Sequence, residues 1–92
     1  MKSITVRLIG KPGCHLCDDA DLVIQGVVKN FSNVVVEHRN LHEKPEWETE
    51  YSEKIPVVHI DDQEFAYWHV DGSALAEALV TNGGIPQTQE SE

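Results

Sequence analysis

The stretch from Gly10 to Cys17 reads G-K-P-G-C-H-L-C and separates two apolar patterns of different period. Before it, apolar residues alternate between positions 4 and 9, which predicts a strand that ends at Gly10 and is partly buried on its second face. After it, apolar residues recur at spacings of three and four over residues 20–31, which predicts an amphipathic helix. Pro12 and Gly13 predict a turn between the two. The two cysteines of the chain therefore lie where a strand passes into a helix.

The chain beyond this helix predicts a second strand and a short second helix. A run of three valines begins a strand from Val34 to about Arg39, and its β-branched continuity predicts burial on both faces. A strand, a helix and a strand in succession imply a parallel pair with a right-handed crossover. Residues 43–46 include a proline suited to a first helical turn, and they open a helix with Trp47 and Tyr51 on one face.

The remaining third of the chain predicts a hairpin and a last helix. A third strand covers Val57 to Ile60, and the turn Asp61-Asp62-Gln63 joins it to a fourth strand from Phe65 to Val70. So short a connection implies antiparallel pairing. Asp71 is a suitable N-cap for the last helix, which stops at residues 82–84.

Length and composition predict one small domain. The chain has 92 residues and is 40% apolar, which suffices for a single core. We expect residues 1–83 to form this domain and residues 84–92 to form a disordered acidic tail. No stretch approaches the roughly 18 apolar residues of a membrane span, and polar residues interrupt the start of the chain where a signal peptide would be apolar. The sequence thus favours a cytoplasmic monomer.

The charge balance narrows the range of partners. Sixteen acidic residues stand against seven basic ones, a formal net charge of -9, and no basic run is present. Binding to nucleic acid requires clustered lysine and arginine, and an anionic membrane surface repels so acidic a chain. We therefore expect neither nucleic acid nor membrane as a partner.

The C-x-x-C pair carries the chemistry. In a reducing compartment such a pair is more often catalytic or metal-binding than structural. A thiolate attacks disulfides, and the N–H groups at the start of a helix would stabilise a thiolate on Cys14. Cys17, one turn further along and on the buried side, suits the resolving step. A protonated His15 would favour the thiolate, whereas the charges of Asp18 and Asp19 would oppose it.

The element order β-α-β-α-β-β-α, with C-x-x-C after the first strand, is typical of a thioredoxin-like redox protein. The chain resembles glutaredoxin-like proteins of the thioredoxin fold, in particular small bacterial ones that carry P-G-C-H-L-C-D, here residues 12–18. Residues 55–58, I-P-V-V, match as well. The resemblance implies an α/β fold with a four-stranded mixed sheet and three helices, and a thiol–disulfide oxidoreductase serving cell redox homeostasis. Its expected partners are a protein or low-molecular-weight disulfide and, as reductant, glutathione or a thioredoxin-reductase-type enzyme.

The resemblance also implies roles for residues outside the cysteine pair. In thioredoxin-like proteins a cis-proline before the third strand faces the C-x-x-C, and the preceding residue's backbone pairs with substrate; Ile55 and Pro56 match these positions. Lys11 matches a basic residue that meets a glutathione carboxylate in glutaredoxins. Glutaredoxins usually hold the γ-glutamyl group of glutathione at a Gly-Gly pair followed by acidic residues after the fourth strand. This chain has Tyr67-Trp68-His69-Val70-Asp71-Gly72-Ser73 there, in which only Asp71 and Ser73 could stand in. Glutathione therefore stays a candidate reductant, and no tightly bound cofactor is expected.

A metal-carrying or inert module is the alternative. Closed zinc sites need four ligands, and the five histidines supply no close second pair beside the cysteines. His59 and His69 flank the predicted hairpin and could approach each other, although histidines on half-buried strands more often form hydrogen bonds. No metal site is assigned from the sequence. The aromatic pairs Trp47/Tyr51 and Tyr67/Trp68 are expected to pack in the core or at its rim. The alternative for Trp68 or Tyr67 is a place at the border of a substrate groove.

Overall fold

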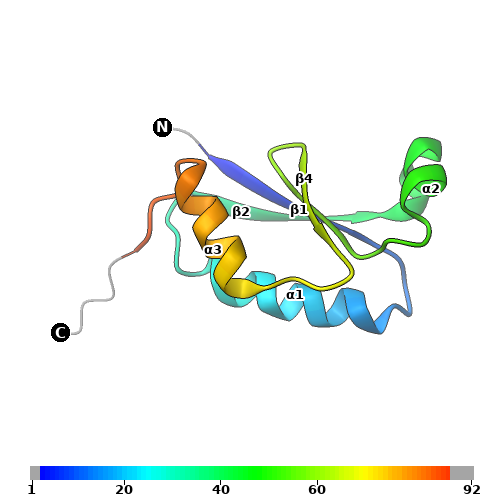
Figure 1. Ribbon diagram of the computed structural model, residues 1–92, viewed down its shortest axis with the longest axis horizontal. Coiled ribbons are helices and arrows are strands. Elements are labelled where there is room, and N and C mark those ends of the chain that lie inside the picture. Colours follow the sequence, from blue (N-terminus) through cyan, green and yellow to red (C-terminus); the bar gives the residue numbers. More distant parts are fainter. Residues whose placement is uncertain (1–2, 88–92) are drawn as a thin grey trace.

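A four-stranded mixed sheet is the frame of the computed structural model, which describes residues 3–87 (Figure 1). Its strands are β1 (Ile4–Gly10), β2 (Val34–Asn40), β3 (Val57–Ile60) and β4 (Gln63–Tyr67), in the order β2-β1-β3-β4. The β1–β2 pair is parallel, and the β1–β3 and β3–β4 pairs are antiparallel. The predicted mixed sheet and its parallel first pair are confirmed.

Three α-helices and one short 3-10 turn connect the strands. They are α1 (His15–Val28), η1 (Leu41–Glu43), α2 (Pro45–Tyr51) and α3 (Gly72–Thr81). Asp71 caps α3 by accepting hydrogen bonds from the backbone N–H groups of Ser73 and Ala74, which satisfies two of the donors that a helix N-terminus leaves free. The order β-α-β-α-β-β-α is the predicted one, with η1 as an addition.

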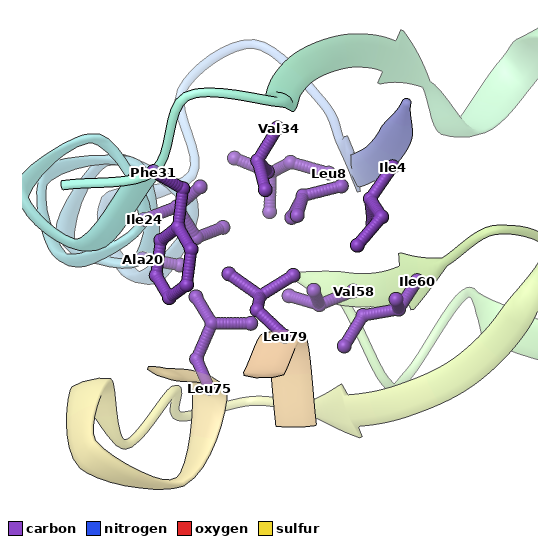
Figure 2. Close-up of a cluster of buried hydrophobic side chains, with 11 residues drawn as sticks. Ile4, Leu8, Ala20, Ile24, Phe31, Val34, Val58, Ile60, Leu75 and Leu79 are labelled. Carbon is purple, nitrogen blue, oxygen red and sulfur yellow. The ribbon is translucent and has the colours of Figure 1, made fainter. Parts of the chain in front are cut away.

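The main core lies between the sheet and the helices α1 and α3, which cover the same face (Figures 1 and 2). Its buried residues are Ile4, Val6, Leu8, Ala20, Ile24, Phe31, Val34, Val58, Ile60, Leu75 and Leu79. Complete burial of one such aliphatic side chain contributes about 1.5–3 kcal/mol to the free energy of unfolding. This layer fixes α1, and hence the cysteines at its start, against β1.

A second, smaller core lies on the opposite face of the sheet. It contains Ile9, Leu41, Trp47, Tyr51 and Val57. The apolar face of α2 therefore covers the end of the sheet where β1 stops and β3 starts. This confirms the predicted partial burial of the second face of β1 and the predicted packing of both aromatic residues of α2.

Strand β2 differs from its prediction. It was expected to be buried on both faces, but Val35 is 53% exposed, whereas Val34 is buried. The reason is its place in the sheet: β2 is an edge strand beside β1, and α2 covers only one end of the second face. The valine run therefore reflects β-propensity, and the prediction of two buried faces is wrong.

The hairpin also differs in its boundaries. Strand β4 begins at Gln63 and ends at Tyr67, two to three residues earlier than predicted. Asp61 and Asp62 form a two-residue loop with φ of 50° and 71°, the left-handed conformation that tight hairpin turns require. Trp68 leaves the strand with φ of 68°, a conformation that costs a non-glycine residue about 1–2 kcal/mol.

The segment after α3 folds back onto the loop that follows α1. The backbone N–H of Ser32 donates to the carbonyl oxygen of Ile85, and the N–H of Gln87 donates to that of Asn30. Residues 84–87 thus differ from the expected tail, whose remaining part, 88–92, lies outside the described residues. Within residues 3–87, no helix has the length and apolar character to cross a membrane.

Candidate active site

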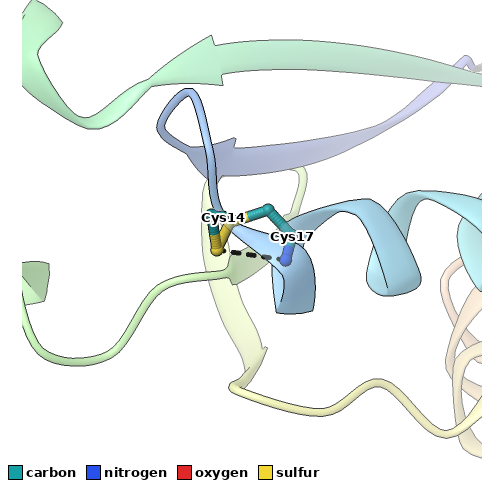
Figure 3. Close-up of a disulfide and its surroundings, with 2 residues drawn as sticks. All are labelled: Cys14 and Cys17. Carbon is teal, nitrogen blue, oxygen red and sulfur yellow. Dashed lines mark hydrogen bonds between the residues drawn. A yellow bond between two sulfur atoms is a disulfide. The ribbon is translucent and has the colours of Figure 1, made fainter.

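The two cysteines lie at the N-terminal end of α1, next to the loop from β1 (Figure 3). They form a disulfide, with their Cα atoms 5.2 Å apart. Cys14 is the N-cap of α1, with extended backbone, and Cys17 lies in the first helical turn. Because Pro12 and Gly13 turn the chain out of β1, Cys14 arrives with the conformation that a helix start requires.

A hydrogen bond connects the two cysteines in addition to their covalent bond. The backbone N–H of Cys17 donates to Sγ of Cys14 over 3.1 Å (Figure 3). The sulfur therefore occupies the place that the side-chain oxygen of an ordinary N-cap takes. In the reduced protein the same donor, together with the positive end of the α1 dipole, would stabilise a negative charge on Cys14.

The two sulfur-bearing residues differ in their access to solvent. Cys14 is partly exposed, whereas Cys17 is 8% exposed and packs against Gly10 at the end of β1. A Cβ atom at Gly10 would lie only 2.7 Å from Sγ of Cys17. The absence of a side chain at Gly10 thus leaves the space that Cys17 occupies. From the sequence, Gly10 was predicted only as the end of the first strand.

Three residues from distant parts of the sequence line the same end of the sheet. Ile9 pairs with Val57, so the next positions along these antiparallel strands bring Gly10 level with Pro56. On the other side, the backbone N–H of Trp68 donates to the carbonyl oxygen of Pro56 over 2.9 Å. Gly10, Pro56 and Trp68 therefore form one row across the sheet, at the end from which α1 starts.

The structure also shows where the other residues lie to which the resemblance assigns a role. The Ile55–Pro56 peptide bond is cis, as expected from thioredoxin-like proteins, and Pro56 is buried at the sheet end just described. Lys11 is exposed in the turn after β1. His15 is the exposed first residue of α1. The roles of Lys11, His15 and Ile55 stay predictions.

A groove lies between α1 and the segment that follows β4. It has a volume of about 130 Å³. Leu16, Asp19, Ala20, Val23, Trp68, His69 and Val70 line it. Trp68 and Leu16 are 49% and 39% exposed. Trp68 was expected in the core or at its rim, with the border of a substrate groove as the alternative, and the structure places it on the wall of this groove.

A larger hollow of about 360 Å³ lies on the β2 side of α1. Its lining includes Lys11, Cys17, Arg39 and Glu43, together with the pair formed by Asp21 and His38. In that pair the carboxylate oxygen Oδ1 and the ring nitrogen Nε2 are 2.8 Å apart. Groups of both signs thus line the hollow beside Cys17.

A separate polar cluster lies on the sheet face that α2 covers. Arg7 contacts Asp62 over 2.7 Å and lies 3.4 Å from Nδ1 of His59, whose Nε2 is 3.2 Å from the hydroxyl of Tyr51. Burial, reinforced by the charge of Arg7, lowers the pKa of His59, and burial raises the pKa of Tyr51. On β2, a hydrogen bond from Arg39 lowers the pKa of Glu37.

The histidines are thus dispersed. His59 is buried in the cluster with Tyr51, while His69 lies exposed on the wall of the groove. Among residues 3–87, no group of three or more histidine, cysteine or carboxylate side chains is arranged to hold a metal ion.

Fold and site together define a protein of the thioredoxin fold with a C-x-x-C disulfide. The family model described as glutaredoxin-like domain (DUF836) matches residues 5–80. The chain therefore belongs to this glutaredoxin-like family. No curated protein matches the chain.

Solved structures show the same fold at low identity. Protein Ne2328 from Nitrosomonas europaea has a TM-score of 0.73 at 19% identity, covering 85% of this chain and 93% of that one. Protein XcR50 from X. campestris has a TM-score of 0.66 at 22% identity, covering 83% and 96%. Oxidised mitochondrial thioredoxin 3 from Saccharomyces cerevisiae has a TM-score of 0.62 at 14% identity, covering 88% and 80%. At these identities the likeness concerns the fold.

Proposed function

We propose that the protein is a thiol–disulfide oxidoreductase in which Cys14 attacks and Cys17 resolves. The observation that supports this most directly is the pairing of a partly exposed N-cap sulfur with the N–H of a buried partner cysteine, 3.1 Å away. Thiol–disulfide exchange needs an accessible thiolate and a second thiol within reach of the mixed disulfide. Cys14 at the N-cap of α1 is suited to be the accessible thiolate, and Cys17 in the first turn is suited to be the second thiol.

The proposed cycle moves two electrons and two protons to the substrate. The Cys14 thiolate attacks one sulfur of the substrate disulfide, forms a mixed disulfide, and releases the other sulfur as a thiolate that takes a proton. The Cys17 thiolate then attacks the Cys14 sulfur, forms the Cys14–Cys17 disulfide, and releases the second substrate thiol. A dithiol, or two molecules of a monothiol such as glutathione, returns the pair to the reduced form.

The row at the sheet end supports a place for the substrate. Pro56 lies level with Gly10, against which Cys17 packs, so the backbone before β3 is close to the cysteine pair. In the proposed complex the backbone of Ile55 pairs with the polypeptide or small molecule that carries the target disulfide, and Lys11 offers a positive charge to a carboxylate. Glutathione as reductant is part of this proposal only as one of two candidates.

The test is a redox titration of the protein thiols against defined ratios of reduced to oxidised dithiothreitol, followed by an assay of disulfide reduction. We expect one intramolecular disulfide to form and disappear across the titration, and wild-type protein to turn over a disulfide substrate. Coupling the assay separately to glutathione and to a thioredoxin reductase identifies the reductant. Cys14→Ser should abolish turnover, because no attacking thiolate remains.

The alternative, a module whose cysteines bind metal or are inert, gives different results. A protein that forms no intramolecular disulfide at any ratio would contradict the redox proposal. Stoichiometric metal retained after purification under reducing conditions, and lost in Cys17→Ser, would support the alternative instead.

A further inference from the structure

Trp68 combines three features that rarely occur together. It is a bulky residue with φ of 68°, it is 49% exposed, and it lies at the sheet end that carries the cysteine pair. A left-handed conformation at a large aromatic residue persists only where the surrounding structure enforces it, and such residues cluster at functional sites. An indole that served only to fill the core would be buried.

Contacts on both sides hold Trp68 in place. Its backbone N–H donates to the carbonyl oxygen of Pro56 and its indole Nε1–H donates to that of Glu53, each over 2.9 Å. The ring of Tyr67 meets the indole edge-on, with centroids 5.1 Å apart, and the ammonium group of Lys54 lies 5.3 Å from the centre of the Tyr67 ring. A rigid, exposed aromatic ring loses little conformational entropy when a partner covers it.

The groove beside the ring has the size of one side chain. Leu16, inside the C-x-x-C motif itself, lines the groove from the α1 side, so the groove reaches the helical turn that follows Cys14. Its volume of about 130 Å³ is well below the roughly 300–1,000 Å³ of pockets that enclose whole small molecules. An apolar side chain near the substrate cysteine fits this groove, whereas a whole tripeptide such as glutathione exceeds it.

The charges near the groove favour some disulfide substrates over others. Asp19 lines the groove together with His69, and the exposed Asp71 directly follows Val70, another lining residue. The whole chain carries a net charge of -9. This field attracts a basic partner and repels glutathione, which has two carboxylates and one ammonium group.

We propose that Trp68 and Leu16 form a recognition groove for polypeptide disulfides, which takes an apolar side chain next to the substrate cysteine and favours a basic flanking sequence. The inference rests on the proposed function, because it names the substrate of the same cysteine pair. Trp68 acts as a specificity-determining residue and takes no part in the sulfur chemistry.

The test compares four disulfides with the reduced wild-type protein in single turnover. Three are symmetrical peptide disulfides: one with leucine beside cysteine and two lysines, one with serine replacing leucine, and one with glutamates replacing the lysines. The fourth is oxidised glutathione. We expect the leucine–lysine peptide to react fastest, by roughly tenfold over the serine peptide, the scale of a single hot-spot side chain.

Variants assign this preference to the groove. Trp68→Ala and Leu16→Ala should each reduce the leucine-to-serine rate ratio toward one, and Trp68→Phe, which keeps a ring but lacks the indole N–H donated to Glu53, should give an intermediate ratio. Leu22→Ala is the matched control, because Leu22 is 73% exposed on the same helix and does not line the groove. Circular dichroism of each variant confirms that it is folded.

The outcomes separate the two proposals. If wild-type protein reduces none of the four disulfides, the proposed function falls and this inference with it. If it reduces all four but Trp68→Ala leaves the leucine-to-serine ratio unchanged, or if oxidised glutathione reacts fastest, the redox function stands and the recognition groove is refuted.

Discussion

The backbone N–H of Cys17 donates a hydrogen bond to Sγ of Cys14 over 3.1 Å, so the sulfur of Cys14 caps the helix that carries Cys17. Cys17 thus provides both the N–H donor that would stabilise a negative charge on the Cys14 sulfur and the sulfur that forms the disulfide with it. Burial of Cys17 against Gly10 leaves Cys14 as the accessible sulfur. This asymmetry has a direct kinetic consequence.

We expect Cys14 to react with iodoacetamide much faster than Cys17 in the reduced protein near neutral pH. Cys14 is the more exposed residue and has the N–H donor, whereas Cys17 is buried. Peptide mass mapping after short exposures gives the two rates. Cys17→Ser should in addition accumulate a mixed disulfide with substrate, and faster labelling of Cys17 would show that the two roles are reversed.

Gly10→Ala should lower the free energy of unfolding by about 1–3 kcal/mol, the usual cost of overpacking a core. The added methyl group would lie 2.7 Å from Sγ of Cys17 and 3.1 Å from its Cβ, and the disulfide to Cys14 prevents Cys17 from moving aside. Urea denaturation of the oxidised protein measures the change.

Gly26→Ala is the matched control for this substitution. Gly26 lies inside α1 and a Cβ there meets no atom within 4 Å. Alanine favours a helix interior over glycine by about 1 kcal/mol, so this variant should be more stable than wild type. If Gly10→Ala and Gly26→Ala change the free energy of unfolding equally, Cys17 leaves enough space for a side chain at position 10.

The main core allows a similar comparison on one helix. Leu79 is fully buried between α3 and the sheet, whereas its neighbour Val80 is 52% exposed. Leu79→Ala should cost about 2–5 kcal/mol, and Val80→Ala should change stability by no more than about 0.5 kcal/mol. Both variants are compared by the midpoint of urea denaturation at constant slope, and a large loss in Val80→Ala would place an unrecognised contact on that face.

Local patterns in the sequence were sufficient for most of the fold. Apolar residues at every second position identified β1, and apolar residues at every third or fourth position identified α1. Asp71 marked the start of α3. The exposure of Val35 depended instead on the order of strands in the sheet, since an edge strand and a central strand have similar valine content. The order of the strands in the sheet cannot be inferred from the pattern of neighbouring residues in one strand.

The candidate site divides in the same way. The C-x-x-C motif identified Cys14 and Cys17, because its spacing is itself the signal. The row formed by Gly10, Pro56 and Trp68 depends on strand register, and the left-handed turn at Trp68 contradicts the usual preference of aromatic residues. In the sequence, residues 65–70 resemble one uninterrupted strand. The pattern therefore did not indicate that the chain leaves the sheet at Trp68.

The buried His59 should make stability depend on pH. Burial, followed by the charge of Arg7, lowers its pKa in the folded state, while Glu64, Asp62 and Glu50 act in the opposite direction with smaller effect. Arg7 faces Nδ1, so the neutral ring accepts there and uses Nε2–H toward Tyr51. Protonation would place two donors face to face.

The sign of the effect follows from linkage. As pH falls below the unfolded value of about 6.5, the unfolded chain binds a proton at His59 before the folded protein does, so the free energy of unfolding decreases until the pH passes the lower, folded pKa. His59→Phe removes this dependence, and the exposed His69 offers a matched control in His69→Gln. We expect urea denaturation between about pH 7 and 5 to show a steeper loss of stability in wild type and in His69→Gln than in His59→Phe. Three parallel curves would mean that His59 is protonated equally easily in the folded and unfolded chains, and the polar cluster around Arg7 would then have no part in the acid sensitivity of the protein.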